Sequence, residues 1–100
     1  LMALTDETES TTTTTAVLIV RIPDASGADL ATDAQRRLRR VAGVDTATVD
    51  GLRGLEPRVS ATLVTVAVTI ESAVSADELR DRFAATVSVE SIDRLAPADS

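Results

Sequence analysis

The chain has 100 residues, enough for one small domain with a single hydrophobic core. It contains no cysteine and no histidine, which excludes disulfides, thiolate metal sites, cysteine nucleophiles and histidine bases. Its formal net charge is −6, and all ten cationic residues are arginine.

The ends of the chain are predicted to be tails around one domain. Residues 1–15 combine an acidic segment with the threonine run Thr11–Thr15, which has nothing to bury, so we expect disorder there. The domain is expected to cover residues 16–97, and residues 98–100 form a short C-terminal tail. Because no apolar run approaches the ~20 residues of a membrane span and no signal-peptide pattern is present, we expect a cytoplasmic protein without membrane partners.

The first predicted element is a short apolar strand at Ala16–Ile22, which Pro23 ends. The residues that follow, 24–27, are typical of a turn. Ser26 then has the spacing of a helix N-cap, with Asp29 in place of the usual Glu or Gln three residues later.

The helix that begins there is predicted to run to about Ala42 and to end at Gly43, which suits a left-handed cap. Asp33 lies four residues before Arg37, and the arginines gather in the last turns, as the helix dipole favours. We interpret this basic cluster as a solvated helix end and expect no nucleic-acid partner, because the chain is acidic and has no tyrosine or tryptophan for base stacking. The cluster consists of Arg36, Arg37, Arg39 and Arg40.

A second strand is predicted at Val44–Asp50, followed by a turn-rich connection over residues 51–58 whose two leucines fold back onto the domain. The longest strand, Val59–Ser72, comes next and alternates cleanly in hydrophobicity. One of its faces carries Val64, Val66, Val68 and Ile70, and the other carries Leu63, Thr65, Ala67 and Thr69.

The last two predicted elements are a helix and a strand. Ser75 and Glu78 form a capping box that begins a helix reaching to about Thr86. Its inward residues are Leu79 and Phe83, and Glu78 pairs with Arg82 one turn later. The final strand, Val87–Leu95, departs from strict alternation, which predicts a bulge near Ser91.

This order of elements, β-α-β-β-α-β, predicts an α+β fold: a ferredoxin-like two-layer sandwich with an antiparallel sheet of strand order 4-1-3-2. With both helices on one face, the other face is open and carries a small apolar patch. We therefore expect a non-enzymatic regulatory or scaffolding module that forms a homo-oligomer through its sheet face or an edge strand. The residues of this open-face patch are Val17, Ile19, Leu63, Thr65 and Ala67.

Other functional classes have weaker support in the sequence. The scattered carboxylates contain no calcium-loop motif, so no metal site and no cofactor are predicted. Catalysis would need a carboxylate in a pocket that raises its pKa, and a domain of this size leaves little room for one. We therefore expect no enzyme activity.

Short motifs connect the chain to known families. Gly43-Val44, Val64–Ile70 and Ser91-Ile92-Asp93 resemble an uncharacterised archaeal family of small ferredoxin-like proteins, a domain of unknown function. An acidic chain without lysine also resembles proteins of halophilic archaea, whose carboxylates stay hydrated in concentrated salt. The segment Val41–Asp50 is similar to heavy-metal-associated domains, but the first loop lacks their Cys pair, which excludes copper or zinc transfer.

The arrangement of Asp24, Gly27 and Leu30 faintly resembles amino-acid-sensing ACT domains, and this resemblance gives the alternative function. It implies a regulatory domain that binds a small molecule at a subunit interface. The ligand would lie on the first turn, at Asp24, Ser26 and Gly27.

Overall fold

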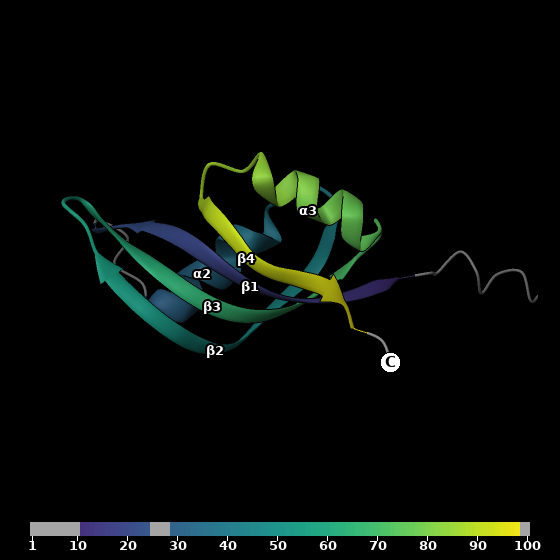
Figure 1. Ribbon diagram of the computed structural model, residues 1–100, viewed down its shortest axis with the longest axis horizontal. Helices are drawn as coiled ribbons and strands as arrows, with labels where there is room; N and C mark the ends of the chain where they lie inside the picture. Colours follow the sequence, from purple (N-terminus) through teal and green to yellow (C-terminus); the bar gives the residue numbers. More distant parts are fainter. Residues whose placement is uncertain (1–10, 25–28, 99–100) are drawn as a thin grey trace, which may run out of the picture.

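Two helices lie against one face of a four-stranded antiparallel sheet, so the fold is α+β and forms a small two-layer arrangement (Figure 1). The computed structural model describes residues 11–24 and 29–98. The order of elements agrees with the prediction from the sequence. The elements are β1 (Thr12–Pro23), α2 (Leu30–Arg39), β2 (Val44–Pro57), β3 (Ala61–Ser72), α3 (Ala76–Ala84) and β4 (Val89–Pro97).

The strands lie in the order β2-β3-β1-β4, with β3 and β1 in the centre and β2 and β4 at the edges. The predicted order was written 4-1-3-2, which counts the same neighbouring strands from the β4 edge. All three strand pairs are antiparallel, and β1 pairs with β3 along its whole length. The side chains of the two central strands therefore make up most of both sheet faces.

Strand β1 begins at Thr12 rather than at Ala16, so the expected tail is too long by most of the threonine run. Thr12–Thr15 pair with Thr69–Ser72 of β3, and Thr14 and Thr15 also pair with β4. Two neighbouring strands thus supply the hydrogen bonds that a threonine run lacks by itself. Residues 1–10 of the predicted tail lie outside the described residues.

Strand β2 continues to Pro57, so the predicted connection over residues 51–58 is wrong. Its pairing with β3 has three irregularities, and two of them lie next to Gly51 and Gly54. Each such bulge shifts the pairing by one residue and bends the strand without ending it. Leu52 and Leu55, expected to fold back onto the domain, are 45% and 57% exposed.

The hairpin between β2 and β3 turns at residues 58–60, where Arg58 N–H donates to Ala61 C=O at 2.7 Å. Strand β3 begins at Ala61 rather than at Val59, whose side chain is fully exposed. The alternation of β3 holds along the rest of the strand. Its four core residues, Val64, Val66, Val68 and Ile70, are at most 1% exposed.

Both helices end earlier than predicted. Helix α2 stops at Arg39 rather than near Ala42, and α3 stops at Ala84 rather than near Thr86. Gly43 has φ +93° in the turn before β2, which confirms the left-handed conformation expected there.

The two helix starts differ in how they are capped. Ser75 is the N-cap of α3, and its hydroxyl accepts from Glu78 N–H at 3.2 Å, which confirms this half of the predicted capping box. Asp29 is the N-cap of α2 but forms no side-chain cap hydrogen bond. Its carboxylate accepts instead from the Thr32 hydroxyl at 2.7 Å. The other predicted partner, Ser26, lies outside the described residues.

Strand β4 covers Val89–Pro97 rather than Val87–Leu95. Its pairing with β1 is interrupted on each side of Ser91, which confirms the predicted bulge near that residue. Val87 is 91% exposed and belongs to the turn after α3.

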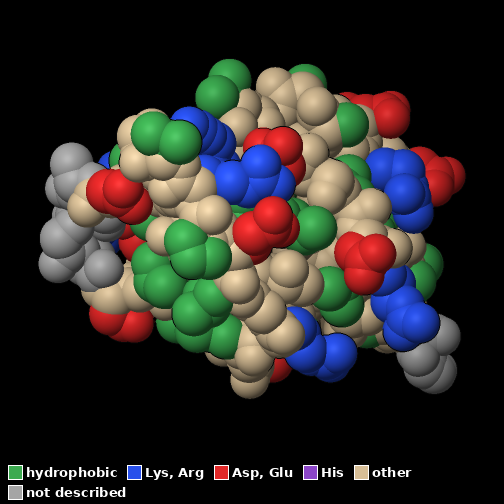
Figure 2. All heavy atoms as spheres, turned by 60° about the vertical axis from the view of Figure 1, so that its left-hand side comes forward, with side chains coloured by type: hydrophobic (Ala, Val, Ile, Leu, Met, Phe, Trp, Pro, Cys, Tyr) green, Lys and Arg blue, Asp and Glu red, His purple; other side chains and the backbone are tan. Residues whose placement is uncertain are grey.

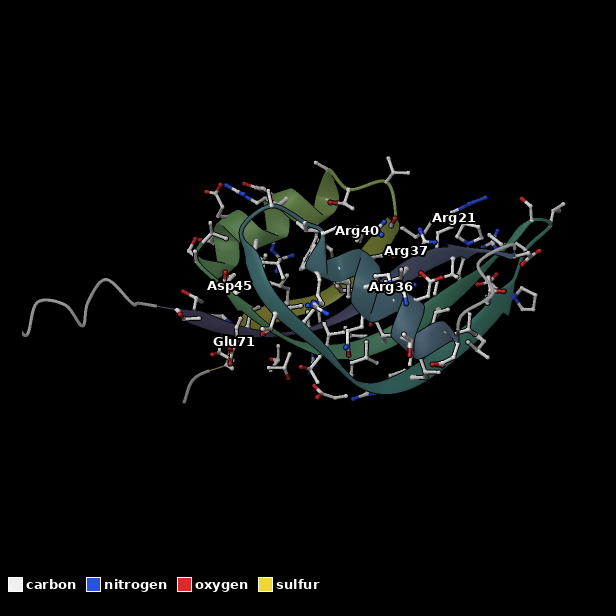
Figure 3. All side chains as sticks on the ribbon, turned by 180° about the vertical axis from the view of Figure 1, so that it is seen from behind. Arg21, Arg36, Arg37, Arg40, Asp45 and Glu71 are labelled. Carbon is white, nitrogen blue, oxygen red and sulfur yellow. The ribbon has the colours of Figure 1, made fainter. Side chains whose placement is uncertain are left out.

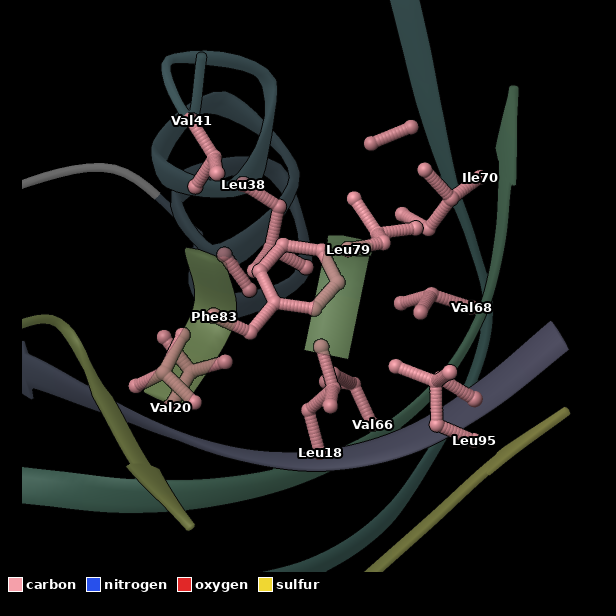
Figure 4. Packing of buried hydrophobic residues seen from close by; sticks show 14 of the residues in the cluster. Leu18, Val20, Leu38, Val41, Val66, Val68, Ile70, Leu79, Phe83 and Leu95 are labelled. Atoms are coloured by element: carbon pink, nitrogen blue, oxygen red, sulfur yellow. The ribbon is translucent and has the colours of Figure 1, made fainter. Parts of the chain in front are cut away.

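The hydrophobic core fills the space between the helices and the sheet (Figure 4). Phe83 and Leu79 of α3 and Leu38 of α2 are completely buried against the central strands. One helix thus covers each half of the sheet face. The predicted ion pairs also form, with Arg37 2.6 Å from Asp33 and Arg82 2.8 Å from Glu78.

Candidate interaction surfaces

The open face of the sheet carries the predicted apolar patch on two paired central strands. Val17 lies opposite Ala67, and Ile19 lies opposite Thr65. These four residues are partly exposed, so they form a contiguous surface that no helix covers. Leu63 differs, because its exposed fraction is only 8%.

Leu63 is mostly buried although it lies on the open side of the sheet. It lines two adjoining hollows together with Arg21, Arg58 and Glu90. An ion pair of 3.0 Å joins Arg58 to Glu56 over the same region. With only 8% of its surface exposed, Leu63 adds little to the patch, so the accessible patch is smaller than predicted.

Two glycines of β2 leave the open face without side chains beside the patch. Gly51 pairs with Ala67, and Gly54 pairs with Thr65. A Cβ atom added to Gly51 would meet no atom within 4 Å, and one on Gly54 would meet only Thr65, at 3.6 Å. Small residues on facing strands thus leave shallow hollows on this side of the sheet.

Charged residues of both signs surround these hollows. The hollow over Val17 and Ala67 has a volume of about 280 Å³, and its charged residues are Asp50, Arg53 and Arg94. The hollow over Ile19 and Thr65 has a volume of about 410 Å³, and its charged residues are Glu56, Arg58 and Glu90. Figure 2 likewise shows acidic and arginine side chains interspersed among apolar ones over one side of the molecule.

In each edge strand, one backbone group is hydrogen-bonded to a side chain of a helix. The Val49 N–H of β2 donates to the Gln35 side chain of α2 at 3.0 Å. The Leu95 C=O of β4 accepts from the Arg80 guanidinium of α3 at 3.1 Å. These contacts interrupt the row of free groups that an added strand would need. No sequence pattern indicates them, because they depend on how each helix lies over its edge strand.

The basic cluster is divided by its surroundings. Arg37 is partly buried in its ion pair with Asp33, whereas Arg36, Arg39 and Arg40 are exposed. Figure 3 shows Arg36, Arg37 and Arg40 along α2, away from the acidic residues Asp45 and Glu71. The interpretation as a helix end is consistent with this geometry, since three of the arginines lie in the last turn.

The predicted ligand turn is only partly described. Asp24 is exposed, and its backbone N–H donates to Ser60 C=O at 3.0 Å, which joins the end of β1 to the β2–β3 turn. Ser26 and Gly27 lie outside the described residues.

The acidic residues do not gather into a metal site in the described part of the chain. Within residues 11–24 and 29–98, no three Asp or Glu side chains are close enough to hold an ion together. The pKa of Asp29 lies below its usual value of 3.8, mainly because the Thr32 hydroxyl donates to its carboxylate. A lowered pKa keeps this carboxyl ionised at neutral pH, so it is not a proton donor there.

Comparison with known proteins assigns no family. No protein-family model matches the chain, and no curated protein matches its sequence. Neither helix in the described part of the chain is long and apolar enough to cross a membrane. Proposals about function therefore depend on the residues of this chain alone.

Proposed function

We propose that the chain is a ferredoxin-like, non-enzymatic interaction module that forms a homodimer through the open face of its sheet. The order of elements and the central position of β1 and β3 support the ferredoxin-like assignment. The observation that carries the proposal is the uncovered apolar patch of Val17, Ile19, Thr65 and Ala67 between two hollows of mixed charge.

The edges support a face-to-face contact over strand addition. The row of free backbone groups on β2 and β4 is interrupted where the side chains of Gln35 and Arg80 bind Val49 N–H and Leu95 C=O. A partner strand would have to displace these side chains before it could pair. The face presents no such obstacle around Ala67, where Gly51 leaves open space.

The charges around the patch favour a second copy as the partner. Consider a two-fold axis that lies between the two sheets and runs across the strands near Ile19. It would place the hollow over Val17 and Ala67 of one copy against the hollow over Ile19 and Thr65 of the other. Strand β4 would then lie over β4, with Arg94 facing Glu90 of the second copy. Strand β2 would bring Arg53 over Glu56 in the same way. A surface with both signs of charge is thus complementary to itself under this symmetry.

The first experiment measures the mass of the protein in solution by light scattering. We expect a dimer at roughly 10–100 µM, where a contact with micromolar Kd is populated. Ala67→Arg should weaken the dimer by at least about 100-fold, because it buries a charge without a partner at the centre of the contact. Ala84→Arg makes the same change at an exposed position of α3 and should leave the mass unchanged.

A charge exchange tests the proposed axis. Arg94→Glu and Glu90→Arg should each weaken the dimer by about tenfold, because each places like charges opposite one another. The double variant restores opposite charges and should recover most of the affinity. A monomeric wild-type protein over the whole concentration range would refute self-association, and a double variant as weak as the single ones would refute this axis.

A further inference from the structure

A groove separates the C-terminal ends of the two helices, in the helix layer rather than on the open face. Its volume is about 420 Å³, which lies within the range of small-molecule sites. Val41, Ala42 and Ala85 give it an apolar surface. Three arginines, Arg37, Arg40 and Arg82, line it as well, together with Thr86 and Ser88.

Arg82 lines this groove and is held in place by hydrogen bonds. Its Nε and Nη2 donate to Glu78 at 3.1 and 2.8 Å, and its Nη1 donates to Ala42 C=O at 2.9 Å. The guanidinium therefore ties the end of α3 to the turn after α2. Three of its five N–H donors, one on each nitrogen, are engaged, so Arg82 has less capacity for a ligand than the other two arginines.

Arg37 and Arg40 are less fully engaged. The contact of Arg37 with Asp33 uses Nε, which leaves both Nη atoms for another acceptor. Arg40 belongs to none of the ion pairs found within residues 11–24 and 29–98. Arg40 is the C-cap residue of α2, three residues after Arg37, and both line the groove.

The charges around the groove do not cancel. Asp33 offsets Arg37, and Glu78 offsets Arg82, but no acidic side chain of the described residues offsets Arg40. The C-terminal carbonyls of both helices lower the local potential. The carbonyl of Ala42, in the turn after α2, already accepts from Arg82. An anion at Arg40 would thus meet a local excess of positive charge in a chain whose formal net charge is −6.

We propose that this groove binds a small organic anion. Arg37 and Arg40 would hold its acidic group, since guanidinium groups form strong charge-assisted hydrogen bonds to carboxylates and phosphates. Its apolar body would cover Val41, Ala42 and Ala85. An inorganic anion would leave these apolar residues exposed, and a neutral apolar molecule would leave the arginines without a partner.

The test uses anilinonaphthalene sulfonate, a fluorescent organic anion with an apolar ring body. Binding is followed by its fluorescence, and the protein adds no background because it has no tryptophan or tyrosine. Octanoate and octyl phosphate are then added as competitors to distinguish a carboxylate ligand from a phosphate ester. Inorganic phosphate has the anionic group alone, and octanol has the apolar body alone. Both should compete with the probe at least about tenfold less well than octanoate or octyl phosphate.

Two matched variants locate the probe. Arg40→Glu should weaken binding by about tenfold or more, through loss of a charge-assisted hydrogen bond. Arg39→Glu makes the same change of charge at the adjacent residue, which does not line the groove, and should change binding less than about twofold.

The proposal is overturned if the wild-type protein binds no probe, if both variants weaken binding equally, or if inorganic phosphate competes as well as octanoate. It is also overturned if Ala67→Arg abolishes probe binding, because the probe would then lie on the open face. Since the groove and the open face are on different layers, the dimer can fail its test while the groove passes, and the reverse.

Discussion

The two faces of the central strands place neighbouring residues in opposite environments. On the helix side of β3, Val64 and Val66 are completely buried in the same core as Leu79 and Phe83. On the other side, Thr65 and Ala67 remain partly exposed beside two glycines of β2. The first face is filled by large aliphatic residues and one Phe, whereas the second has small residues and hollows. Stability should therefore depend on the first face and association on the second.

The largest expected effect comes from removing the aromatic ring that fills the helix side. Phe83→Ala should lower the free energy of unfolding by about 3–5 kcal/mol, because it leaves a cavity at a fully buried position. Ile19→Ala on the open face should cost only about 1 kcal/mol, since its side chain is partly exposed already. Urea unfolding followed by circular dichroism measures both. Equal losses would remove the energetic contrast between the faces.

Two adjacent threonines sharpen the comparison at the start of β1. The Thr14 hydroxyl is fully buried on the helix side and has no hydrogen-bond partner among the described residues. Thr14→Val should therefore stabilise the protein by about 1 kcal/mol, because it removes an unsatisfied polar group at nearly constant shape. Thr15→Val, on the exposed side, should change stability by less than about 0.5 kcal/mol. A destabilised Thr14→Val variant in thermal unfolding would show that the hydroxyl has a partner after all.

The smallest expected effect concerns the exposed start of α2. Thr32→Val removes the hydroxyl that donates to Asp29, so the pKa of Asp29 should rise toward its usual value of 3.8. Because the folded-state pKa is lowered, the stabilisation from this contact is present above the unfolded pKa and is lost as the pH falls through the folded pKa. An NMR titration of the Asp29 carboxyl in both proteins measures the shift. An identical pKa in the two proteins would mean that the hydrogen bond has no electrostatic effect.

The alternation of β3 and the N-cap of α3 were predictable because both depend on residues that are close together in the sequence. Val64, Val66, Val68 and Ile70 repeat every two residues, and only one face of a strand can bury such a set. Ser75 likewise has its partner, Glu78, three residues later. Signals of this kind need no knowledge of the rest of the fold.

The errors fall where distant strands supply what the local sequence lacks. Gly51, Gly54 and Pro57 are typical of turns, yet pairing with β3, with a bulge beside each glycine, keeps them in a strand. Most of the threonine run forms the start of β1, because β3 and β4 pair with it. Both outcomes depend on tertiary hydrogen bonds, which residue preferences alone do not reveal.

The candidate surfaces show the same division. Alternation was enough to place Val17, Ile19, Thr65 and Ala67 on one face, but not to show that Leu63 on the same face is mostly buried. The groove at the helix ends could not be predicted, because it depends on the turns after α2 and α3. The sequence showed Arg37 and Arg40 only as members of a basic cluster at the end of the first helix, and Arg82 only as the partner of Glu78.

The side chains that occupy the sheet edges also set a limit on how large an assembly can become. A sheet with free edges can add strands without end, and the product is a fibre. In this chain, Gln35 and Arg80 break that continuity at β2 and β4. In contrast, a contact that one face makes around a two-fold axis is complete in a dimer, because each copy has only one such face. We therefore expect association to stop at a closed pair, and the protein to remain dispersed at concentrations that would drive an open-edged sheet to aggregate.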